Sequence, residues 1–184
     1  MESKIKKILY QGMPLICLVD LVKKETKKRL ALAQEGLQKE IEKYPEVSAT
    51  LGNAFAEFQI LLATHDYPDT MACDMITKNI NPVLNVFQHM MARQAEIVAY
   101  RQLLEKLDNF SGFKEFVNIF KPVDSAGSFF ERAVIQNINK YYSKIINGVL
   151  NQAQCELKKI KEQEREKGIE YLEKMEKEGE VSNS

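Results

Sequence analysis

The chain has 184 residues, of which 45% are hydrophobic and 28% are charged, and its 26 basic side chains balance 26 acidic ones. This length suits one cooperative core and is short for two, and the charge balance excludes the overall positive field that drives non-specific binding to nucleic acid. Tryptophan is absent, and only eight glycines and five prolines occur. That is too few for the turns of an all-β fold, so the composition predicts an all-α protein.

The first twenty residues combine lysines at positions 4, 6 and 7 with an apolar run from Ile8 to Val19, as a secretory signal does. Gln11, Gly12 and Pro14 interrupt the run, and no Ala-x-Ala-like cleavage site follows it. The run is also too short to span a bilayer. We interpret this segment as part of the folded protein and expect a cytoplasmic location, with a cleaved signal peptide as the alternative.

The prolines divide the next hundred residues into helical segments, because proline fixes φ and lacks a backbone N–H. Pro14 suits the first turn of a helix that we expect to end at Tyr44, before Pro45. The apolar face of this helix steps by three or four residues and comprises Val19, Val22, Thr26, Leu30, Ala33, Leu37 and Ile41. A second helix is predicted over residues 47–65.

A third helix is predicted to begin after Asp69, a plausible N-cap, and to kink or break at Pro82. Its apolar face is expected to comprise Met71, Met75, Ile76, Leu84, Phe87, Met91, Ile97, Leu104 and Leu107. Six of the nine phenylalanines then fall between residues 110 and 130. Turn residues on both sides of the segment predict a short helix from Gly112 to Phe120.

Phe113, Phe116 and Phe120 share one face of this short helix. Aromatic side chains at helical spacing are usually core residues, so we favour a segment that plugs the end of the bundle. The functional alternative is an apolar lid or groove for a partner helix or a lipid chain.

Ser128 and Glu131 have the spacing of a capping box and predict a final helix from Phe129 to about Glu178. At ~1.5 Å per residue this helix spans on the order of 75 Å, more than a domain of this size needs. Its apolar residues recur until Ile160 and then become sparse. We therefore predict an up-and-down bundle of four or five helices over residues 1–160, with a charged helical extension and frayed tail over 161–184.

Apolar side chains return thinly in the extension, among many Glu and Lys residues. The candidate partner-binding residues are Ile160, Ile169, Leu172 and Met175. In a helix that pairs with another helix, such residues are buried and the charges select register and orientation. We expect a protein partner or a homo-oligomer, with the protein acting as an adaptor, scaffold or regulatory subunit. A solvated single helix or a disordered tail is the structural alternative.

A local basic patch near the N-terminus suggests a second hypothesis, peripheral binding to a membrane or another anionic surface. Its residues are Lys23, Lys24, Lys27, Lys28 and Arg29, with only Glu25 against them. Ile5, Ile8 and Leu9 would provide the apolar contact. A solvated helix face is the simpler interpretation. The lack of aromatic residues among the lysines argues against nucleic acid.

No motif predicts catalysis, a metal or a cofactor. The densest group of potential ligands comprises His65, Asp66, Asp69, Cys73 and Asp74. The chain has only two histidines, too few for a helical metal phosphohydrolase or a ferritin-like di-iron site, and its glycines have no phosphate-loop spacing. The three cysteines, Cys17, Cys73 and Cys155, are expected to be reduced core thiols. We therefore predict a protein that is not an enzyme.

Overall fold

The computed structural model describes residues 1–64, 70–123 and 127–181, and within these ranges it contains five α-helices and no strand. They are α1 (Glu2–Tyr10), α2 (Leu15–Thr64), α3 (Thr70–Asp108), α4 (Phe113–Ile119) and α5 (Phe129–Val181). The predicted all-α bundle with a long C-terminal helix is confirmed.

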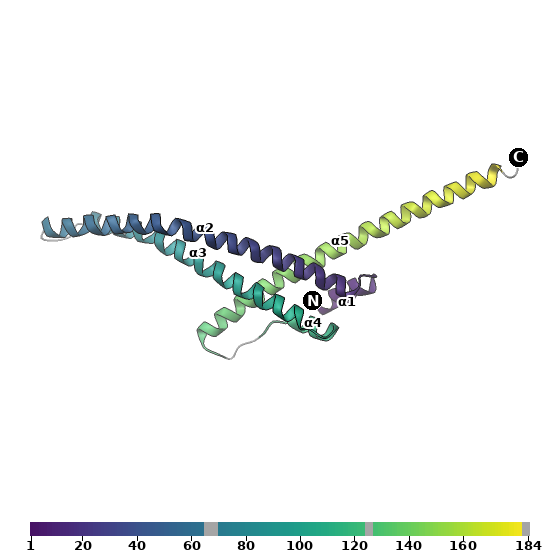
Figure 1. The fold of residues 1–184 in the computed structure, drawn as a ribbon, viewed down its shortest axis with the longest axis horizontal. Helices are drawn as coiled ribbons and strands as arrows, with labels where there is room; N and C mark the ends of the chain where they lie inside the picture. The colour runs from purple at the N-terminus through teal and green to yellow at the C-terminus, as the bar shows by residue number, and fades with distance from the viewer. Residues whose placement is uncertain (65–69, 124–126, 182–184) are drawn as a thin grey trace.

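The α2–α3 pair forms an antiparallel hairpin, which is the most extensive helix contact in the molecule (Figure 1). The middle of α5 crosses the base of this hairpin, near α1 and α4. From the crossing, the hairpin extends in one direction and the C-terminal part of α5 in another. The molecule therefore has a core at the crossing and two projecting arms.

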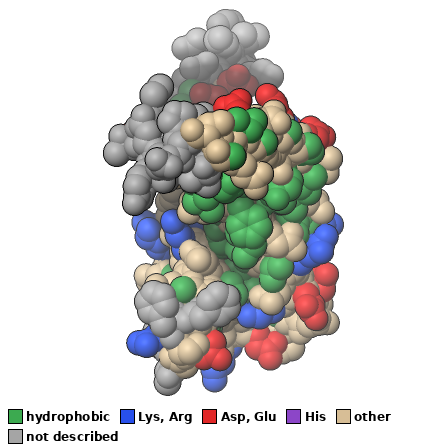
Figure 2. Space-filling view, turned by 90° about the vertical axis from the view of Figure 1, so that its left-hand side faces the viewer, with side chains coloured by type: hydrophobic (Ala, Val, Ile, Leu, Met, Phe, Trp, Pro, Cys, Tyr) green, Lys and Arg blue, Asp and Glu red, His purple; other side chains and the backbone are tan. Residues whose placement is uncertain are grey.

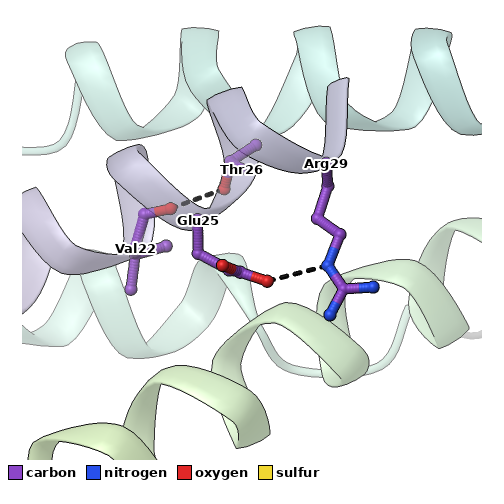
Figure 3. A network of polar contacts seen from close by, with 4 residues as sticks. All are labelled: Val22, Glu25, Thr26 and Arg29. Atoms are coloured by element: carbon purple, nitrogen blue, oxygen red, sulfur yellow. Dashed lines mark hydrogen bonds and ion pairs between the residues drawn. The ribbon is translucent and has the colours of Figure 1, made fainter. Parts of the chain in front are cut away.

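All five helices contribute fully buried apolar side chains to the core, each worth roughly 1.5–3 kcal/mol of transfer free energy. The largest of them are Ile5, Ile8, Leu18, Val19, Val22, Leu103, Leu107, Phe116, Phe120, Ile145, Ile146 and Leu150. The first part of the expected face of α2 lies here, since Val19, Val22, Thr26 and Ala33 are buried, but Ile41 at its far end is exposed. Thr26 donates its hydroxyl hydrogen to the carbonyl oxygen of Val22 at 2.7 Å (Figure 3), so its burial leaves no unsatisfied donor.

The two interior prolines do not behave as the sequence predicted. Pro45 does not end a helix: α2 continues to Thr64 as a single helix, and α3 continues through Pro82 without a break. An interior proline costs about 3 kcal/mol, but the two helices pack along the hairpin, with Ala54 and Val86 buried. This packing offsets the lost backbone bonds.

Pro45 and Pro82 lie at about the same level of the hairpin. Glu40 Oε2 lies 3.8 Å from His89 Nδ1, and a Cβ added to Gly36 would lie 2.9 Å from Arg93 Nε. These two contacts fix the antiparallel register, which places Pro45 almost opposite Pro82.

The predicted start of the last helix agrees with the structure. Ser128 donates its backbone N–H to Glu131 Oε2 at 2.8 Å, and Glu131 donates its backbone N–H to Ser128 Oγ at 3.3 Å. The predicted capping box of α5 is therefore confirmed. The proposed N-cap Asp69 lies outside the described residues.

The sequence did not predict α1, which ends in a Schellman motif at Gly12. The N–H of Gly12 donates to Leu9 and that of Met13 to Ile8, at 3.1 and 3.4 Å. Gly12 has φ of +105°, a conformation that a residue with a side chain adopts only with strain. The motif turns the chain so that α1 packs back onto the core.

The prediction of core thiols is wrong for two of the three cysteines. Cys17 and Cys155 are free and exposed, because their helices turn the neighbouring apolar residues Leu18 and Leu157 inward instead. The side chain of Cys73 lies outside the described residues.

Two glycine substitutions should change stability in opposite directions. Gly52 is helical and no atom lies within 4 Å of an added Cβ, so Gly52→Ala is expected to raise the free energy of unfolding by about 0.5–1 kcal/mol. Gly12→Ala is expected to lower it by about 1 kcal/mol, since alanine is strained at positive φ. Urea denaturation followed by circular dichroism measures both changes in the free energy of unfolding. Changes of the same sign in the two variants would contradict the helical conformation of Gly52 or the positive φ of Gly12.

Candidate interaction surfaces

The C-terminal part of α5 leaves the core after Leu157. Every described side chain from residue 158 to 170 is exposed, including Ile160 and Ile169 at 48% and 47%. This segment projects away from the other helices in Figure 1. The side chains of Leu172 and Met175 lie outside the described residues.

The four candidate partner-binding residues do not form one stripe. At about 100° per residue, Ile160 and Ile169 lie on nearly opposite sides of α5. Ile160 continues the stripe that includes Ala153 and Leu157, which are buried in the core. Ile169 shares a side with Leu172 by sequence spacing.

The basic patch on α2 is partly neutralised. Lys23 Nζ lies 2.7 Å from Asp108 Oδ1 at the end of α3, and Arg29 Nε lies 2.7 Å from Glu25 Oε1 (Figure 3). The sequence identified Glu25 as the only opposing charge, and this was wrong because Asp108 comes from another helix. Each exposed pair is worth about 0–1 kcal/mol.

The rest of the basic patch consists of Lys24, Lys27 and Lys28, which are exposed and form no ion pair with any residue that the structure describes. Two of the three expected apolar contacts are not available beside them, because Ile5 and Ile8 are fully buried, and Leu9 is partly buried against the core. Within the described ranges, none of the helices is long and apolar enough to cross a bilayer.

The phenylalanine-rich segment closes the core. Phe116 and Phe120 are buried, and aromatic contacts link Phe110 to Phe116, Phe116 to Phe120 and Phe120 to Tyr142, with ring centroids 5.9, 5.4 and 6.4 Å apart. Phe113 is partly buried beside them. In this structure Phe116 and Phe120 are core residues rather than the lining of an open groove, as the plug interpretation expects.

Tyr142 is a buried residue that the sequence analysis missed. It is 4% exposed, its hydroxyl has no hydrogen-bond partner among the described residues, and burial raises its pKa to about 12. Lys106 Nζ lies 5.5 Å from the centre of its ring. The i,i+4 spacing of Ile138, Tyr142 and Ile146 is the sequence signal that could have revealed it.

A polar groove of about 440 Å³ lies along one side of the hairpin base, where Lys144 of α5 also borders it. Several of its cations have carboxylate partners: Lys39 with Glu35 at 2.6 Å, Lys43 with Glu40 at 3.3 Å and Arg93 with Glu96 at 2.8 Å. Lys144 forms no ion pair with any described residue. The hydrogen bond from Lys39 lowers the pKa of Glu35. Most of the positive charge around the groove is therefore already paired with carboxylates.

The predicted apolar face of the distal part of α3 is wrong. Leu84, Phe87 and Met91, which we expected in the core, are 48%, 53% and 59% exposed. Val86 is buried instead, and Met90 is partly buried. Both stripes are apolar, so hydrophobic periodicity alone could not choose between them.

The exposed stripe continues into an apolar cavity of about 250 Å³ at the start of α5. There Met91, Ala95 and Val98 of α3 face Val134 and Tyr141 of α5. Figure 2 looks onto the hairpin end of the molecule and shows a patch of hydrophobic side chains with charged ones around its margins. Exposed apolar patches of this kind often mark interaction sites.

Among the described residues no group of His, Cys, Asp or Glu could hold a metal ion. Of the candidate ligands, His65, Asp66, Asp69 and the side chain of Cys73 lie outside the described residues. No protein-family model, curated protein or solved structure matches the chain.

Proposed function

We propose that this chain is a non-catalytic helical interaction protein, an adaptor, scaffold or regulatory subunit, that binds a protein partner or a second copy through α5. The observation that supports this function is the continuation of α5 beyond Leu157 as a fully exposed helix. A solvent-exposed helix gains little stability from propensity alone, and a partner helix supplies the missing packing.

By sequence spacing, the contact would be centred on Ile169 and Leu172 with Met175 at its edge, and the surrounding Glu and Lys residues would set orientation. Ile160 lies on another side and would extend the contact near the core. The exposed thiols of Cys17 and Cys155 suit a reducing compartment such as the cytoplasm.

Light scattering after gel filtration tests this function on the full chain, on a truncation that ends at Ile160 and on the variant Ile169→Glu. We expect the full chain to form an oligomer, and the truncation and Ile169→Glu to form assemblies with fewer copies, because they remove the α5 contact but no buried core residue. Gln163→Glu adds the same charge at an exposed position and should leave the mass unchanged. A truncation that keeps the same number of copies as the full chain would exclude self-association through the extension.

The exposed Lys24, Lys27 and Lys28 support a second candidate, electrostatic binding to an anionic surface. With Ile5 and Ile8 in the core, this binding would depend on charge alone and would weaken with salt. Sedimentation with anionic and with neutral vesicles at two salt concentrations tests it. Equal recovery with the two kinds of vesicle would exclude this candidate.

A further inference from the structure

The distal hairpin carries an unusually uncharged surface. Between Val47 and Met91 the only Asp, Glu, Lys or Arg residues are Glu57, Asp66, Asp69, Asp74 and Lys78, whereas such residues make up 28% of the whole chain. A two-helix hairpin outside the core has only one buried seam, so the rest of this surface faces solvent unless something covers it.

The large exposed apolar side chains lie mostly on one side of the hairpin. The polar groove occupies the side that carries Lys39, Lys43 and Arg93. At about 100° per residue, Ile41 and Tyr44 on α2 and Phe87 and Met91 on α3 lie on the other side of the seam. The exposed apolar face of the hairpin comprises Ile41, Tyr44, Phe55, Leu84, Phe87 and Met91.

We propose that the apolar face of the hairpin binds the same face of a second copy of this chain, so that two hairpins form a four-helix bundle. This proposal deepens the proposed function by identifying a second copy as a partner, and it does not depend on the α5 extension. An isologous contact of this kind requires a self-complementary face. A face without charges meets its own copy without like-charge repulsion.

The area of the face approaches what a stable dimer needs. Each of its six side chains is 41–59% exposed. With about 200 Å² for a large side chain, they present roughly 600 Å², close to the ~800 Å² per partner of a stable interface. Neighbouring polar side chains would supply the remainder as the rim.

A membrane is a poorer occupant than a second copy. The sequence that joins α2 to α3 contains Asp66 and Asp69, so two carboxylates would have to enter the lipid first. Asn81 and Asn85 on α3 would also face lipid or headgroups. Burying such groups without partners is costly, whereas a hairpin dimer leaves them in water.

Light scattering over a dilution series tests the dimer in the full chain. We expect the double variant Phe87→Glu/Met91→Glu to halve the mass, because it places four charges in the interface. The matched control, Asn81→Glu/Asn85→Glu, adds the same charges at exposed positions on the back of α3 and should remain dimeric. Phe55→Glu, on the other helix, should also halve the mass.

Circular dichroism should be unchanged in all three variants, because every substituted side chain is exposed. A full chain that is monomeric throughout, with or without binding to vesicles, would overturn the proposal. So would a double variant that stays dimeric while the truncation at Ile160 becomes a monomer, since α5 alone would then carry assembly. If the double variant becomes monomeric while the truncation stays dimeric, the hairpin proposal holds and self-association through α5 fails.

Discussion

Phe116→Ala is expected to lower the free energy of unfolding by about 3–5 kcal/mol. Phe116 is fully buried, and its ring lies between those of Phe110 and Phe120 at centroid distances of 5.9 and 5.4 Å. Alanine would leave a cavity at the point where α4 closes the core. A helix as short as α4 is not stable without its packing against the core. Domains of this kind have about 5–15 kcal/mol of stability, so the variant should be close to unfolding.

Urea denaturation followed by circular dichroism measures this loss. Phe113→Ala is the matched control, since it removes the same side chain from the same helix at a partly buried position. Phe113→Ala should lower the free energy of unfolding clearly less than Phe116→Ala does. Equal losses for the two variants would contradict the assignment of Phe116 as the central residue of the plug.

Alkaline pH is expected to destabilise the protein through Tyr142. The hydroxyl ionises near its ordinary pKa of 10.0 in the unfolded chain, but burial raises the folded pKa to about 12. The stability that depends on the neutral form is therefore complete below pH 10 and is lost as the pH rises towards 12. Two pKa units correspond to roughly 2–3 kcal/mol.

Tyr142→Phe isolates this contribution. The variant should lose most of the alkaline slope, and near neutral pH it should be as stable as the parent or up to about 1 kcal/mol more stable, because the buried hydroxyl has no partner among the described residues. Burial also raises the pKa of Tyr100 and Tyr141, so part of the slope should remain. Tyr10→Phe, at an exposed position, is the control. If Tyr142→Phe lost stability with rising pH as steeply as the parent, Tyr142 would not be the cause of the alkaline destabilisation.

Local signals predicted the features that depend on local physics. The scarcity of glycine and proline predicted helices, and the capping box of Ser128 and Glu131 fixed the start of α5. The apolar face of α2 near the core was also correct, since Val19 and Val22 have buried neighbours at helical spacing. In each case, the residues that carry the signal lie within a few turns of the feature that they predict.

The missed features depend on contacts between distant segments. Pro45 would end an isolated helix, and α2 continues only because α3 lies along it. The exposure of Phe87 and the burial of Val86 were not predictable, because two adjacent apolar stripes on α3 have the same period. Of the candidate site, the sequence predicted the projecting helix but not the apolar face of the hairpin.

The matching positions of Pro45 and Pro82 have a mechanical consequence. Each proline removes the helical hydrogen bond that would reach the carbonyl four residues earlier, at Ile41 and Lys78, so the backbone of both helices is weakened at one cross-section. The distal hairpin can therefore bend or open as a unit while the core stays closed. In the proposed dimer, the same joint would let each distal hairpin adjust its angle to the other.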